Sequence, residues 1–298
     1  MRHWLKNSDY SRLIKNTSAL GLVQLSNTLL PLITLPFLAR VLGSSNFGLV
    51  LMAQATMVYF SILTDYGFNL SATKHIARHQ KNQPKVSAIF SDVLATKCAL
   101  LLLGLFILAG MVHWVPLFNA HGTLFYASFL VVVGNTFLPT FLFLGLEKMS
   151  LIAGLNFVAK CGFTGLIFWL IDEPSDYVWV HALWGMSYIL VDILAIGLIV
   201  WQLKITWSRP SLNGIFNHLS HSFEYFLSRL AIACYLYINV IVVGIVLSTE
   251  TAGHYGGAEK LLFAITTFYT PLIEAIYPYI SRTKNQRFAK KRPARAPR

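Results

Sequence analysis

Three charged residues, Lys97, Lys160 and Asp192, lie within hydrophobic runs that are long enough to cross a lipid bilayer. A charge near the bilayer centre costs about 3 kcal/mol on insertion scales, and more where it faces lipid. Charged side chains are therefore retained there when they face a water-filled interior or another charged group. Because such interiors are typical of transporters, the chemistry expected first is the binding of an ionic ligand.

The composition is that of a membrane protein. Hydrophobic residues make up 55% of the 298 residues and charged residues only 12%, whereas about 25% of a soluble domain is charged. The formal net charge of +12 could suggest nucleic acid. However, the basic residues cluster in short segments between apolar runs, as in the cytoplasmic loops of membrane proteins. We therefore expect membrane lipids, and no nucleic acid, as partners.

The apolar runs predict the fold class. A membrane-crossing helix needs about 20 mostly apolar residues. Runs of that length predict about eight spans, at residues 17–39, 47–66, 88–112, 123–146, 151–171, 178–202, 224–247 and 258–280. We expect an all-α, polytopic transmembrane helical bundle. Pro139 is expected to bend or break the fourth span, because proline removes a backbone donor.

The loops predict the orientation. Basic residues occur in the N-terminal segment, in the loop 74–85, at Lys148, in the loop 204–209 and in the C-terminal tail. The intervening loops hold few basic residues, and one of them carries Asp172 and Glu173. The positive-inside rule then predicts a multi-pass protein with both termini in the cytoplasm.

Two polar segments, 69–85 and 204–223, are interpreted as amphipathic helices at the cytoplasmic interface. In the first segment, Leu70, Ile76 and Ala77 recur near helical spacing beside basic residues. Plain solvated loops are the alternative for both segments.

The deeply placed charges carry a surplus of cations. Lys97, Lys160 and Arg229 stand against Asp192, which leaves the interior net positive. A positive cavity favours an anionic ligand such as a phosphate or diphosphate headgroup. Dry structural pairs between helices are the alternative.

Catalysis finds little support in the chain. No Gly-rich loop precedes a Lys-Ser or Lys-Thr pair, no HExxH spacing occurs, and the three cysteines form no CxxC pair. The outward loops are short. We expect no enzyme activity, no cofactor and no metal site.

Motifs in several parts of the chain resemble those of Wzx-type O-antigen flippases. They are Leu30-Pro31-Leu32 with Phe37 to Gly43 and Asn46-Phe47-Gly48, then Asp65 to Thr73, Glu147-Lys148-Met149 and Ala275-Ile276-Tyr277-Pro278. The motifs lie in order over residues 10–281, and the set is specific although each piece alone is weak.

The resemblance implies membership of the polysaccharide-exporter branch related to MATE carriers, with two six-helix lobes around a central cavity. Such proteins move undecaprenyl-diphosphate-linked oligosaccharide from the cytoplasmic to the periplasmic leaflet of the bacterial inner membrane. The implied mechanism is alternating access, and the implied partners are the lipid-linked oligosaccharide and other polysaccharide-assembly proteins. Of the basic positions, Arg40 and Lys97 match the family, and Arg229 matches by type alone.

Together, the residues and the resemblance predict a candidate site. The expected substrate-binding cations are Arg40, Lys97, Lys160 and Arg229, and the expected charge partners or ion-coupling residues are Asp65 and Asp192.

The predicted domains are an N-terminal six-helix lobe over 1–209, the first two helices of an incomplete second lobe over 210–281, and a basic cytoplasmic tail over 282–298. A weak repeat supports two lobes, because Val41 to Gly48 has a looser counterpart in Val246 to Gly256. Family members are usually longer, so we expect a truncated chain. A related exporter of another cargo and a non-functional remnant are the alternatives.

Overall fold

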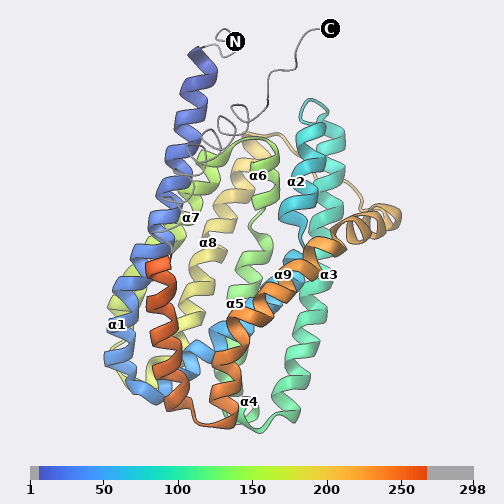
Figure 1. Ribbon diagram of the computed structural model, residues 1–298. Coiled ribbons are helices and arrows are strands. Elements are labelled where there is room, and N and C mark those ends of the chain that lie inside the picture. Colours follow the sequence, from blue (N-terminus) through green and yellow to red (C-terminus); the bar gives the residue numbers. More distant parts are fainter. Residues whose placement is uncertain (1–6, 267–298) are drawn as a thin grey trace, which may run out of the picture. The chain divides into compact units, whose positions relative to one another are not determined.

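The computed structural model describes residues 7–266, and within them every regular element is helical (Figure 1). The elements are α1 (Asn7–Asp65), α2 (Phe68–Arg78), α3 (Gln83–Trp114), α4 (Pro116–Ala120), α5 (Gly122–Phe137), α6 (Thr140–Gly145), α7 (Met149–Leu170), the 3-10 helix η1 (Pro174–Val178), α8 (Trp179–Trp201) and α9 (Leu212–Val246). Residues 249–266 are also helical. The chain divides into two compact units, Met1–Gly256 and Gly257–Arg298, and the contacts described below belong to the first.

The predicted all-helical polytopic bundle is confirmed. Among the described residues, six segments are long and apolar enough to cross a membrane: Leu32–Arg78, Gln83–Trp114, Gly122–Gly145, Met149–Leu170, Pro174–Trp201 and Leu212–Val246. The first segment contains both the end of the predicted span 17–39 and the whole of 47–66. The predicted span 258–280 runs beyond residue 266, and the tail 282–298 and the motif Ala275 to Pro278 lie outside the described residues.

Two breaks in long helices have clear causes. Gly43 has φ 73° and ψ 166°, which takes the backbone out of the helical region and divides α1 into two halves; a positive φ costs glycine little. The predicted break at Pro139 is confirmed, because α5 ends at Phe137 and α6 begins at Thr140.

The two predicted amphipathic segments have different outcomes. The first forms α2, in which Ile76 is fully buried, whereas Leu70 is 55% exposed and so does not belong to the buried side. In the second, residues 202–211 are non-helical and the remainder is the start of α9. α9 thus begins well before the predicted span 224–247.

The core around α2 and α6 positions the charged residues described below. Phe68, Ile76, Phe141 and Tyr188 are buried in one apolar cluster. A side chain of α2 also bonds the α6 backbone: the Thr73 hydroxyl donates to the Phe141 carbonyl over 3.2 Å. α8 contributes to the same cluster through Tyr188, Val191 and Ala195, so the helices that carry the charged residues meet in a packed interior.

A tight turn joins α1 to α2. Tyr66 has φ 45° and Gly67 has φ 81°, so two successive residues adopt left-handed backbone conformations. The Tyr66 amide donates to the Ile62 carbonyl at 2.9 Å, and the Ser71 amide donates to the Gly67 carbonyl at 3.1 Å. A Cβ atom on Gly67 would lie 2.6 Å from the Tyr225 Cβ atom, so the turn also needs glycine for the close approach of α9.

We expect Gly67→Ala to destabilise the protein. The left-handed conformation costs a residue with a Cβ atom about 1–2 kcal/mol, and the overlap with Tyr225 adds to that cost. Gly197→Ala is the matched control, because Gly197 is helical and no atom lies within 4 Å of its added Cβ. Thermal unfolding in detergent, followed by tryptophan fluorescence, compares the two variants. Equal stability would contradict this account of the turn.

Candidate functional site

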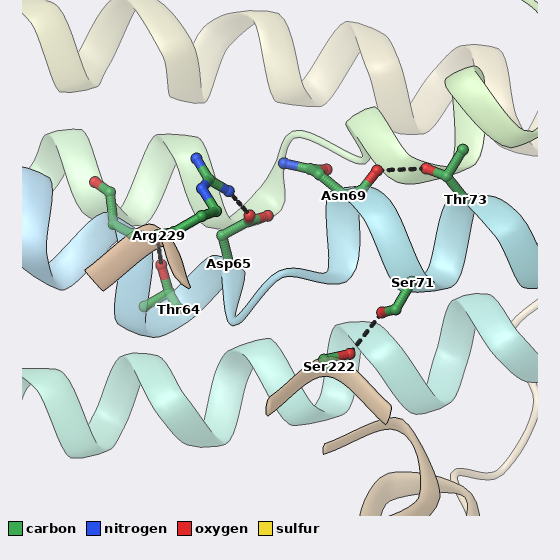
Figure 2. Close-up of polar contacts among 8 residues, drawn as sticks. Thr64, Asp65, Asn69, Ser71, Thr73, Ser222 and Arg229 are labelled. Carbon is green, nitrogen blue, oxygen red and sulfur yellow. Dashed lines mark hydrogen bonds and ion pairs between the residues drawn. The ribbon is translucent and has the colours of Figure 1, made fainter. Parts of the chain in front are cut away.

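One face of α9 lies against the turn and α2 (Figure 2). The rings of Tyr66 and Phe226 stack with centroids 4.6 Å apart and an interplanar angle of 11°. One turn earlier on α9, the hydroxyls of Ser222 and Ser71 share a hydrogen bond of 2.5 Å. Residues four apart lie on the same face of a helix, so the next positions along this stripe also face α1 and α2.

Further along the same face of α9, Arg229 forms an ion pair. A guanidinium nitrogen of Arg229 donates to a carboxylate oxygen of Asp65, the last residue of α1. The Asp65 side chain is 12% exposed, whereas the Arg229 side chain remains 43% exposed. The aspartate is therefore buried beneath the arginine, and the guanidinium has further donors that reach the surface of this part of the chain.

Lys97 lies deeper, within the packed helices. Its residue is 1% exposed, and its Nζ atom lies 5.8 Å from the centroid of the Phe141 ring. Asp65, Asp192 and Arg229 are within electrostatic range of the amine. The lysine on α3 thus lies near the charged groups of α1, α8 and α9.

Asp192 is the second buried carboxylate. It is 3% exposed, and neither of its carboxylate oxygens has a hydrogen-bond partner among the described residues. An unpaired buried charge is costly, so the electrostatic proximity of Lys97 is the stabilising interaction that the structure provides. We call Asp65, Lys97, Asp192 and Arg229 the charged cluster. Its two cations and two carboxylates balance formally.

The structure does not place all the predicted cations together. Lys160 is half-buried on α7, and no ion pair within 4 Å joins it to a described residue. Arg40 is exposed and lies three residues before the break at Gly43. Asp65 lies at the other end of the second half of α1, about 30 Å away at 1.5 Å per residue. Arg40 therefore lies near one end of the bundle and away from the charged cluster, which lies near the middle of α3, α8 and α9.

Sequence reasoning missed Asp92, which positions the start of α9. Its carboxylate accepts a hydrogen bond of 2.8 Å from the Ser211 amide, and the Ser211 hydroxyl accepts one of 2.9 Å from the Gly214 amide. Ser91 supports the same loop by accepting from the Ser208 amide at 2.9 Å. The available signal was a carboxylate inside a predicted span, where a buried charge needs a partner.

The fold and the charged cluster define a multi-pass helical membrane protein with ionisable groups inside its bundle. Residues 13–284 match the family described as "Polysaccharide biosynthesis protein". The chain belongs to this family, which confirms the family membership expected from the motifs.

Two curated relatives align over 280 residues, which is 93% of this chain. One, from Escherichia coli (strain K12), is 33% identical, and the alignment covers 67% of its length. The other, from Shigella dysenteriae, is 30% identical, and the alignment covers 69% of its length. Both are named "Putative O-antigen transporter". No solved structure gives a significant match.

We expect Asp65 and Arg229 to be energetically coupled. In a double-mutant cycle with Asp65→Asn and Arg229→Gln, the coupling in the free energy of unfolding should be about 1 kcal/mol. It should not be larger, because the arginine is 43% exposed and solvent weakens an exposed pair. Arg209→Gln, at an exposed loop arginine, is the matched control and should be additive with Asp65→Asn. Additivity in both cycles would show that the ion pair does not stabilise the protein.

Proposed function

We propose that this protein exports O-antigen or related oligosaccharide repeat units, carried on undecaprenyl diphosphate, from the cytoplasmic to the periplasmic leaflet of the bacterial inner membrane. The names of the two relatives and the family match support transport of polysaccharide material. The motif series supports the lipid-linked form of the cargo. The same observations favour a transporter without enzyme activity. The distribution of basic residues among the loops supports a cytoplasmic location for both termini.

The observation that carries the proposal is the half-exposed arginine above a buried carboxylate. A guanidinium is planar and presents five N–H donors that match the geometry of a phosphate. Asp65 contacts one of its nitrogen atoms and thereby holds the side chain in place, while 43% of that side chain stays accessible. In this proposal Arg229 binds the diphosphate of the cargo, and Asp65 is its positioning residue.

The remaining predicted residues keep their proposed roles in the same scheme. Lys97 is buried near the ion pair; in this scheme its positive charge attracts the diphosphate from within the packed helices, and Asp192 offsets that charge when no cargo is bound. Lys160 and Arg40 are proposed to meet the cargo elsewhere along its path, since neither belongs to the charged cluster. Alternating access between two lobes, over 1–209 and 210–281, is the proposed mechanism.

Complementation tests the function. In a bacterial strain that lacks its own O-antigen flippase, expression of this chain should restore O-antigen at the cell surface. Arg229→Ala should abolish that restoration, and Arg229→Lys should retain part of it, because lysine keeps the charge but loses the planar fork. Arg209→Ala is the control for loss of an exposed arginine. The proposal is wrong if Arg229→Ala, present in the membrane in normal amounts, exports as well as the unsubstituted chain.

A second comparison separates cargo binding by Lys97 from a purely structural pair with Asp192. Lys97→Ala alone leaves a buried carboxylate without its neighbouring cation, so the amount of protein in the membrane should fall. Lys97→Ala with Asp192→Asn removes both charges and should recover the protein amount. We expect export to stay low in this double variant, because the buried positive charge that attracts the cargo is still missing. Recovery of export together with the protein would assign Lys97 a structural role instead.

A further inference from the structure

The weak repeat noted in the sequence forms a symmetric contact within the first compact unit. The segment after the α1 break aligns with the segment after α9 at a constant offset of 205 residues. Ser44, Ser45 and Gly48 then correspond to Thr249, Glu250 and Gly253. The two segments lie against one another. Both follow a long helix and begin the next helical stretch.

The hydrogen bonds across this contact come as a symmetric pair. The Ser45 hydroxyl shares a hydrogen bond of 2.8 Å with the Thr249 hydroxyl, and the Ser44 hydroxyl donates to the Glu250 carboxylate over 3.2 Å. Under the correspondence above, each bond is the counterpart of the other. A self-complementary exchange of this kind is what a local two-fold axis produces.

The close packing obeys the same relation. A Cβ atom on Gly48 would overlap the Thr249 carbonyl oxygen, and a Cβ atom on Gly253 would overlap its counterpart, the Ser44 carbonyl oxygen. Three residues further along, a Cβ atom on Gly256 would lie 2.8 Å from a methyl carbon of Leu51, and these two positions also correspond. Small residues let the backbones of two membrane helices approach closely, so the helices cross on the axis at Gly48 and Gly253.

The contact lies at one end of the bundle, whereas the charged cluster lies near the middle of α3, α8 and α9. Residues 44–65 are one continuous helical stretch, about 30 Å long at 1.5 Å per residue, with the contact at one end and Asp65 at the other. The two related segments therefore pack together at this end, with no room between their backbones for a Cβ atom at Gly48 or Gly253. Asn46 adds to the closure by donating to the Pro174 carbonyl over 2.8 Å.

We propose that the contact of Ser44, Ser45 and Gly48 with Thr249, Glu250 and Gly253 is a latch that closes this end of the bundle to the cargo, and that it parts during each transport cycle. The role in transport rests on the proposed function, whereas the two-fold contact itself does not. Its bonds are few and between partly exposed side chains. Such bonds are individually weak and suit a contact that must break and re-form.

A cross-link tests whether the latch must part. In a chain whose three native cysteines are replaced by serine, Ser45→Cys with Thr249→Cys should form a disulfide. The disulfide is detected without any transport assay, through a protease site inserted in the exposed turn at Lys81. Cleavage there releases two fragments, which stay together only if positions 45 and 249 are bonded. Ser45→Cys with Thr251→Cys is the matched control, because the Thr251 hydroxyl bonds Ser248 instead. The disulfide should stop O-antigen export, and a reductant should restore it.

A labelling experiment tests opening independently of export. Ala252 is fully buried behind the contact, so Ala252→Cys should react slowly with a water-soluble maleimide. Adding Gly48→Ala, which forces the helices apart, should speed that reaction, whereas Gly197→Ala should leave it unchanged.

The outcomes distinguish the latch from the transport function. Any one of three results would overturn the latch. The disulfide between positions 45 and 249 does not form, or it forms and leaves export intact, or Ala252→Cys never reacts even with Gly48→Ala. If the starting chain exports nothing but the cysteine at 252 reacts as expected, the proposed function fails and the opening contact stands.

Discussion

The ion pair between Asp65 and Arg229 joins the end of α1 to the middle of α9, two helices far apart in the sequence. Several features around it serve to bring these two residues together. The Tyr66-Gly67 turn reverses the chain directly after Asp65, the ring stack with Phe226 fixes the rotation of α9, and Asp92 holds the loop where α9 begins. A carboxylate buried in an apolar bundle requires such a partner, because the cost of desolvating it is otherwise unmatched.

The same constraint explains how the middle of the bundle differs from the end that holds the latch. Near the middle of α3, α8 and α9, charges on four helices lie near one another, and one of them, Arg229, stays accessible. At the end, small residues and hydroxyls form a close contact without any buried charge. In the function we propose, the charges in the middle attract an anionic cargo, and the contact at the end parts to let it leave. Charge thus distinguishes the two regions as much as helix packing does.

Much of this was predictable from the sequence, and the remainder was not for physical reasons. Hydrophobic runs predict the helices because the bilayer sets their length, and Pro139 predicts the break between α5 and α6 because it lacks a donor. Individual ionisable residues were also found, because each is exceptional in its apolar surroundings. Asp65 and Asp192 were expected as charge partners, but the pairing of Asp65 with Arg229 was not predicted, since it depends on how α9 crosses the turn after Asp65. Asp92 was overlooked, because its partner is a backbone amide 119 residues away that no periodicity reveals.

The most direct measurement of the central claim is lipid binding to the purified chain in nanodiscs, comparing undecaprenyl diphosphate with undecaprenol. The two lipids share the hydrocarbon chain and differ in the charged headgroup. We expect the diphosphate lipid to bind more tightly to the unsubstituted chain, and we expect that preference to disappear in Arg229→Ala and persist in Arg209→Ala. Equal binding of both lipids, or an undiminished preference in Arg229→Ala, would contradict the assignment of Arg229 as the group that receives the cargo.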